Sequence, residues 1–104
     1  MKLNPQDEEL INARPTRSLE AYDAYLLGRK RMYANEIASL NEAIRSFERA
    51  ISLDDQYAAA FAGVCEANLS LYVKTSNIDY FDAAQAACEK GLSIDDESAE
   101  VHVS

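Results

Sequence analysis

Residues 42–61 read EAIRSFERAISLDDQYAAAF and residues 83–102 read AAQAACEKGLSIDDESAEVH, and these two stretches are similar to each other. They align with an offset of 41 residues. The matched positions include Ala43 with Ala84, Glu48 with Glu89, Ser52 with Ser93, and Asp54-Asp55 with Asp95-Asp96. One unit is therefore written twice, and an internal repeat of this length indicates a repeat architecture.

Each copy has the spacing of an amphipathic helix. Apolar residues recur at steps of three and four, which places them on one helical face. In the first copy these residues are Leu40, Ala43, Ile44, Phe47, Ala50 and Ile51, and in the second they are Tyr80, Ala83, Ala84, Ala87, Cys88, Gly91 and Leu92. No stretch shows the alternation of a strand, so the predicted fold class is all-α.

Polar residues mark the predicted helix ends. Ser39, with Glu42 three residues later, predicts a capping box at the start of the first copy. Ser18 predicts the start of an earlier helix, residues 58–72 form another, and Asn77 or Asp79 caps the last. We expect Asp54-Asp55 and Asp95-Asp96 to end their helices and to cap new ones that begin near Gln56 and Glu97.

The first residues predict a separate segment. Asn4-Pro5 is a suitable start for a short helix, and Pro15 should separate it from the next helix. We therefore divide the chain into a lead segment, 1–17, and a helical repeat domain, 18–104.

The negative net charge of the chain excludes some classes of binding partner. The 104 residues hold 10 Lys and Arg against 18 Asp and Glu, a net charge of −8. Such a chain is poorly suited to nucleic acid or to an anionic membrane surface, because both recruit cations. No apolar run approaches the roughly 20 residues that cross a bilayer. Asp7, Glu8 and Glu9 stand where a secretory signal would be apolar, so we expect a cytoplasmic protein.

The order of these residues resembles the tetratricopeptide repeat, a pair of antiparallel helices of roughly 34 residues. The matching positions are Ala24, Leu27, Gly28, Ala43 and Phe47 in a first unit, Phe61, Val64, Cys65, Asn68, Ala84 and Cys88 in a second, and Ala99 and His102 at the start of a third. The closing Pro is missing, Arg31 and Asn68 replace an aromatic residue, and Cys88 replaces Phe. The resemblance implies stacked antiparallel pairs in a right-handed superhelix, about two repeats plus the start of a third.

A narrower resemblance covers PTRSLEAYDAYLLGRK, residues 15–30, and AIRSFERAISLDDQYAAAFAGV, residues 43–64. Both runs resemble the opening repeats of a C-terminal array in bacterial signalling proteins. In those proteins an adenylate-cyclase-like or winged-helix DNA-binding domain precedes the array. The resemblance implies a fragment of a larger protein of this kind.

In the tetratricopeptide family, ligands bind a groove formed by the first helix of each pair. Carried over by position, its residues here are Tyr22, Tyr25, Arg29, Met32, Ala62, Glu66 and Leu69. Tyr and Arg are frequent interface anchors, although Tyr22 and Tyr25 could instead pack the N-terminal end. Glu66 would repel a peptide carboxylate, so an apolar and basic segment fits the acidic surface better.

The two cysteines allow more than one chemistry. Cys65 and Cys88 could form a disulfide or part of a metal site, but both lie at apolar positions of facing helices. One His and no Cys-x-x-Cys leave a metal short of ligands. We predict reduced core thiols, because no secretory signal is expected. His102 falls at a packing position, and the Asp pairs lack the ligand spacing of a calcium loop.

No residue pattern predicts catalysis. A nucleophile with its base, a phosphate-binding Gly loop and a Glu-x-x-His motif are all missing. We therefore expect no catalytic residue, cofactor or metal, and predict a non-catalytic scaffold module that binds an unidentified protein or peptide. The second hypothesis is structural self-association as a homodimer through Ala99, Val101 and Val103, at the open end of the array.

Overall fold

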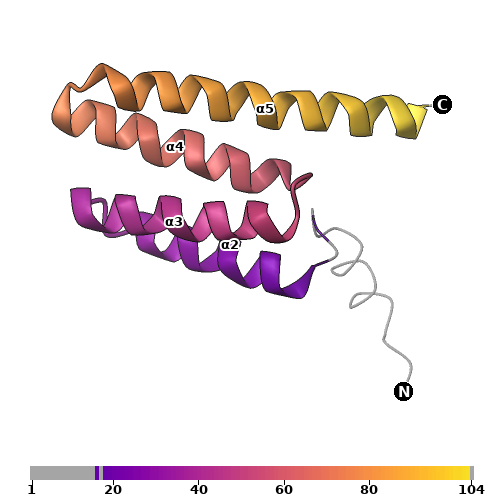
Figure 1. The fold of residues 1–104 in the computed structure, drawn as a ribbon, viewed down its shortest axis with the longest axis horizontal. Coiled ribbons are helices and arrows are strands. Elements are labelled where there is room, and N and C mark those ends of the chain that lie inside the picture. The colour runs from indigo at the N-terminus through magenta and orange to yellow at the C-terminus, as the bar shows by residue number, and fades with distance from the viewer. Residues whose placement is uncertain (1–15, 17, 104) are drawn as a thin grey trace.

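The computed structural model describes residue 16 and residues 18–103, with side chains up to Ile94. Four helices succeed one another: α2 (Leu19–Met32), α3 (Ile37–Leu53), α4 (Ala58–Thr75) and α5 (Ile78–Val103). The described part of the chain contains no strand, so the all-α prediction is confirmed. Figure 1 shows the helices side by side, each antiparallel to the one before it.

The helices form a stack of two pairs. Extensive contacts join α2 to α3, α3 to α4 and α4 to α5, and α2 also touches α4. The backbones of α3 and α5 do not meet in the part of the chain that is described, because α4 lies between them. This arrangement is a helical repeat-like architecture in which α2 and α4 hold equivalent places, as do α3 and α5.

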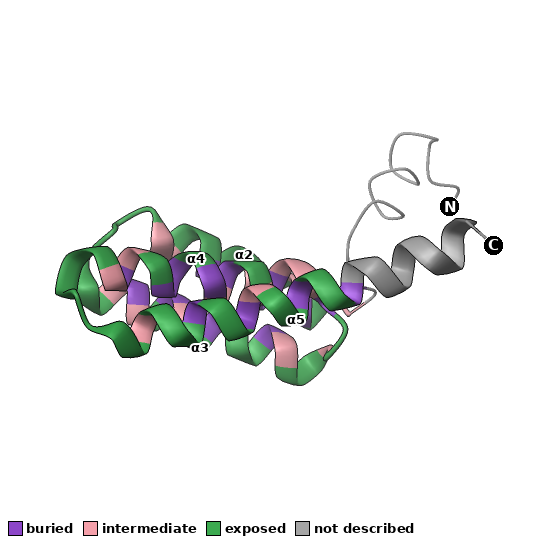
Figure 2. Cartoon of the chain, turned by 90° about the horizontal axis from the view of Figure 1, so that it is seen from above, coloured by how far each residue is buried: buried purple, intermediate pink, exposed green. Residues whose placement is uncertain are grey.

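Phe47 is the centre of the core. Its side chain is fully buried, and its ring lies against Gly28 of α2 on one side and Gly63 of α4 on the other. A Cβ atom added at either glycine would come within 2.7 Å of a ring carbon, so each position requires the missing side chain. One aromatic ring thus joins three helices, and Figure 2 shows the buried residues on the inner faces of the helices.

Tyr57, directly before α4, is fully buried beside Ala21, Ala50 and Ala60. Among the described residues its phenol oxygen has no hydrogen-bond partner. Burial, together with the nearby Tyr25, raises the pKa of this phenol well above its ordinary value. The ring anchors the start of α4, and its hydroxyl group is the one polar atom in this cluster without compensation.

Ser18 and Asn77 are confirmed as helix caps, whereas Ser39 is not a cap. Ser18 caps α2 by accepting a hydrogen bond from the Ala21 amide at 3.1 Å. Asn77 precedes α5 and accepts from the Asp79 amide at 3.0 Å. Ser39, however, is the third residue of α3 and not its cap. Glu36 occupies the cap position, and its backbone amide donates to the Ser39 hydroxyl, so the capping box runs one turn earlier than predicted.

The predicted break at Asp95-Asp96 is wrong, because α5 continues through both residues and through Glu97 to Val103. In the first copy the chain does leave the helix, at Asp54, whose carboxylate accepts hydrogen bonds from Thr16 and from the Gln56 amide. The next helix begins at Ala58, where the predicted segment 58–72 begins and just after the capped start predicted near Gln56.

The sequence offers a reason for this difference between the copies. The buried Tyr57 fixes the first turn, whereas the repeat places Ser98 at the matching position. Without a large apolar anchor there, the helical hydrogen bonds simply continue.

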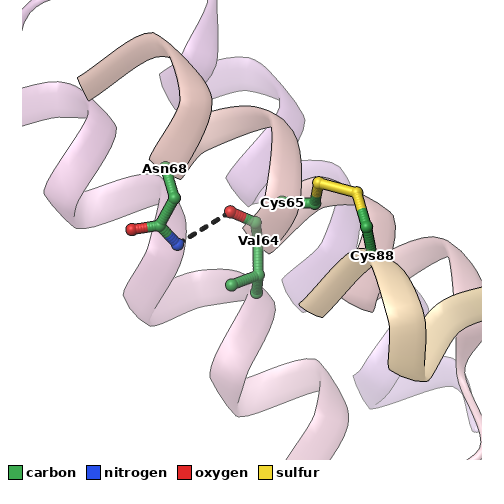
Figure 3. The surroundings of a disulfide bond; sticks show 4 residues. All are labelled: Val64, Cys65, Asn68 and Cys88. Atoms are coloured by element: carbon green, nitrogen blue, oxygen red, sulfur yellow. Dashed lines mark hydrogen bonds between the residues drawn. A yellow bond between two sulfur atoms is a disulfide. The ribbon is translucent and has the colours of Figure 1, made fainter. Parts of the chain in front are cut away.

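The prediction of reduced thiols is also wrong, because Cys65 of α4 and Cys88 of α5 form a disulfide (Figure 3). Cys65 is buried, as expected of a core position. The apolar faces of two antiparallel helices bring the two residues together, with their Cα atoms 5.3 Å apart, inside the range that a disulfide spans. Sequence spacing placed the cysteines on facing helices but gave no information on the distance between them.

Several predictions concern residues or side chains that lie outside the described part of the chain. The short helix after Asn4-Pro5 lies there, as does the lead segment except for Thr16, which is buried against Asp54. The side chains of Ala99, Val101, His102 and Val103 lie there too. None of the helices is both long and apolar enough to traverse a lipid bilayer, as far as the described residues extend.

Candidate interaction groove

The groove lies where the last turn of α2 meets the middle of α4. Arg29 and Met32 line it from α2, Tyr33 lines it from the position directly after α2, and Glu66 lines it from α4. The four residues enclose an open pocket of about 200 Å³. Because α2 and α4 are both antiparallel to α3, they run in the same direction, and the C-terminal ends of both helices lie at the same end of the stack (Figure 1).

An ion pair crosses the groove. The guanidinium of Arg29 lies 3.5 Å from the carboxylate of Glu66, and about half of each side chain is exposed. A pair this exposed contributes about 0–1 kcal/mol, so it orients the two side chains more than it stabilises the fold. Either charge is available to a ligand that offers a better partner.

Arg31, in the same turn of α2 as Arg29, attaches this turn to α3. Its guanidinium lies 3.9 Å from Glu42 and donates a 3.4 Å hydrogen bond to the hydroxyl of Ser46, both on α3. The run Arg29-Lys30-Arg31 lies in the last turn of α2, where cations interact favourably with the helix dipole. These contacts hold the last turn of α2 against α3 and leave Arg29 directed to α4.

The apolar lining of the groove comes from Met32 and Tyr33, and two exposed apolar residues of α4 lie further along that helix. Met32 packs against the buried cluster of Leu40 and Leu71 while it lines the pocket. Tyr33, at the rim, is 86% exposed, and on α4 Leu69 and Val73 are 40% and 79% exposed. Solvent-facing apolar groups beside a concave site are typical of protein-binding surfaces.

The structure brings together Arg29, Met32 and Glu66 among the seven predicted groove residues. Leu69 lies one turn beyond Glu66 and is exposed, and Ala62 lies one turn before it, also exposed. Tyr33 was missed. The available signal was an aromatic residue one turn after Arg29, at the point where the helix pattern ends.

Tyr25 has a different environment. Its ring packs against the rings of Phe47 and Tyr57, with centroids 5.7 and 5.3 Å apart. Tyr25 and Tyr22 are both half-buried at the N-terminal side of the groove. The contacts of Tyr25 favour the packing interpretation that the sequence left open.

The described residues contain no group of His, Cys, Asp and Glu that could hold a metal ion. Comparison with family models, curated proteins and solved structures finds no match to this chain. The chemistry of the groove itself therefore determines the ligands that fit: it offers one anion, one cation and an apolar wall.

Proposed function

We propose that this chain is a non-catalytic interaction module that holds a protein or peptide segment in the groove between α2 and α4. The observation that carries the proposal is the pocket lined by Arg29, Met32, Tyr33 and Glu66, with its exposed ion pair beside exposed apolar groups. The order of the repeat residues supports a tetratricopeptide-like stack, and the narrower resemblance supports a place within a larger bacterial signalling protein.

The partner that fits is a segment with apolar and basic side chains. The net charge of −8 attracts cations at a distance, which favours encounter with a basic segment. At the groove, a Lys or Arg of the ligand pairs with Glu66, and an apolar side chain packs on Met32 and Tyr33. Displacement of Arg29 from Glu66 costs little, because the existing pair is exposed to solvent.

Selection from a phage library of random peptides, about 12 residues long, tests this proposal. We expect the selected sequences to be enriched in Lys or Arg next to Leu or Phe. The Glu66→Lys variant should weaken their binding about tenfold, which corresponds to ~1.4 kcal/mol. Tyr33→Ala should weaken it similarly through lost apolar contact.

The matched control is Leu53→Ala. Leu53 is an exposed apolar residue at the C-terminal end of α3, and it does not line the groove. Its affinity for the selected peptides should equal that of the unmodified chain. The proposal fails if the selected peptides lack basic residues, or if Leu53→Ala lowers affinity as much as Glu66→Lys does.

Self-association is the second candidate, and the outer face of α5 favours it. Phe81 and Leu92 repeat the positions of Leu40 and Ile51, which pack toward α4, yet Leu92 is 64% exposed. A second copy could cover this face. Sedimentation of the unmodified chain and of Leu92→Glu decides the question, because only the unmodified chain should gain mass with concentration.

A further inference from the structure

The disulfide occupies the place in the second helix pair that a buried ring occupies in the first. The 41-residue repeat matches Cys88 of α5 to Phe47 of α3, and the unit alignment matches Cys65 of α4 to Gly28 of α2. In the first pair the ring of Phe47 packs against Gly28. In the second pair a covalent bond joins the matching residues.

Helices α4 and α5 are in extensive contact, but the side chains that α5 buries in its middle are small. Up to Ile94, the buried residues of α5 are Ala84, Ala87, Gly91 and Ile94, so only the last has a large side chain. At Gly91 the two helices approach closely, because a Cβ atom added there would lie 3.3 Å from the carbonyl oxygen of Ala58 on α4. Alanine and glycine contribute little hydrophobic free energy, because they remove little apolar area from water.

Among the larger apolar residues of α5 before Ile94, Tyr80 packs against Leu40 and Leu71 near the start of the helix. Ile78, Phe81 and Leu92 are all exposed. Phe81 contacts Tyr72, but both lie near the turn between α4 and α5, where the two helices are already joined by the chain. Between Tyr80 and Ile94, the bond between Cys65 and Cys88 is therefore the covalent attachment of α5 to α4, beside contacts made by small side chains.

We propose that Cys65 and Cys88 are a reversible redox modification site whose oxidised form fastens α5 to α4 and whose reduced form releases it. The reductant is a dithiol. This inference does not depend on the groove between α2 and α4, which lies on other residues.

The exchange proceeds in two balanced steps. A thiolate of the dithiol attacks the sulfur of Cys88, the more accessible of the two residues, and the bond to Cys65 breaks. The electron pair leaves on the Cys65 sulfur, which takes a proton. The second thiolate of the reductant then attacks the mixed disulfide, which frees Cys88 as a thiol and leaves the reductant as a disulfide. Two electrons and two protons pass to the protein.

Release of α5 changes the surface of α4. A second pocket, of about 450 Å³, lies between α3 and α5 over Phe61 and Val64, with Ala87 on its α5 side. When α5 loosens, this half-buried apolar floor becomes more exposed. Reduction therefore enlarges the exposed apolar surface of α4.

Hydrogen exchange with and without dithiothreitol tests the proposal on the unmodified chain. In the oxidised protein the amides of α5 between residues 84 and 94 should be protected. After reduction they should exchange roughly tenfold faster or more, while the amides of α2 and α3 keep their rates. Glutathione disulfide should restore the protection.

Two results overturn the proposal: equal α5 exchange in both redox states, or a parallel acceleration in α2 and α3, which would mean global unfolding. The double variant Cys65→Ser with Cys88→Ser should exchange at the reduced rate with or without dithiothreitol. The double variant Cys65→Gly with Cys88→Phe copies the first helix pair, and it should protect α5 independently of dithiothreitol. Loss of protection in that variant would refute the equivalence of ring and disulfide.

Discussion

Replacement of Gly28 by alanine has two opposite effects on the free energy of unfolding: a gain in helix propensity and a clash with the ring of Phe47. Alanine favours a helix over glycine by about 1 kcal/mol. Its Cβ atom, however, would lie 2.7 Å from the ring of Phe47, where overpacking costs about 1–3 kcal/mol. The ring has little room to move, because it also lies close to α4, where a Cβ atom added at Gly63 would meet it at 2.7 Å. The clash should therefore win, with a net loss of about 1 kcal/mol in the free energy of unfolding.

Urea unfolding monitored by far-UV circular dichroism measures this loss, and a double-mutant cycle isolates its cause. In a Phe47→Leu background the clash disappears, so Gly28→Ala should become neutral or stabilising. The matched control is Gly91→Ala, where the nearest atom would lie 3.3 Å away and the penalty should be much smaller. If Gly28→Ala stabilises the chain, or if the two substitutions are additive, the account of the three-helix contact is wrong.

Three further predictions concern Tyr57 and Ser18. Tyr57→Phe should raise the free energy of unfolding by about 1 kcal/mol, because it removes a buried hydroxyl without a partner; a clear loss in urea unfolding would show that the hydroxyl is bonded. Burial raises the pKa of the Tyr57 phenol in the folded state, so the folded chain favours the neutral phenol. The free energy of unfolding should therefore be independent of this group below pH 10 and should fall by about 1.4 kcal/mol per pH unit above it. Tyr57→Phe should flatten that alkaline slope, and an unchanged slope would assign it to another group. Ser18→Ala should lower stability by about 1 kcal/mol and speed amide exchange in the first turn of α2 only, whereas unchanged exchange there would exclude the cap.

The sequence was sufficient for the helices and for most of the core. The spacing around Phe47 and the repeated Ala43 and Ala84 predicted both second helices of the pairs, and all three residues are buried. Apolar periodicity is a property of one helix and its covered face, so it can be recognised locally. Ser18 and Asn77 were found for the same reason, since a cap acts within three residues.

Features that depend on distance between helices could not be found in this way. The bond between Cys65 and Cys88 needs their Cα atoms to lie 5.3 Å apart, and periodicity gives only the face on which each residue lies. The turn at Asp54 and the continued helix at Asp95 share the Asp-Asp pair, and the largest change in side chain comes three residues later, where the first copy has Tyr57 and the second has Ser98. Tyr25 shows the same limit: its type suggested a binding role, whereas Phe47 and Tyr57 determine its position.

The most direct test of the interaction proposal is to map a selected peptide on the isotope-labelled chain by NMR. The account predicts that the largest amide shifts fall at Arg29, Met32, Tyr33 and Glu66, and that α5 shows little change. Shifts centred on Ile51 and Phe61, in the pocket between α3 and α5, would contradict the assignment of the groove to α2 and α4.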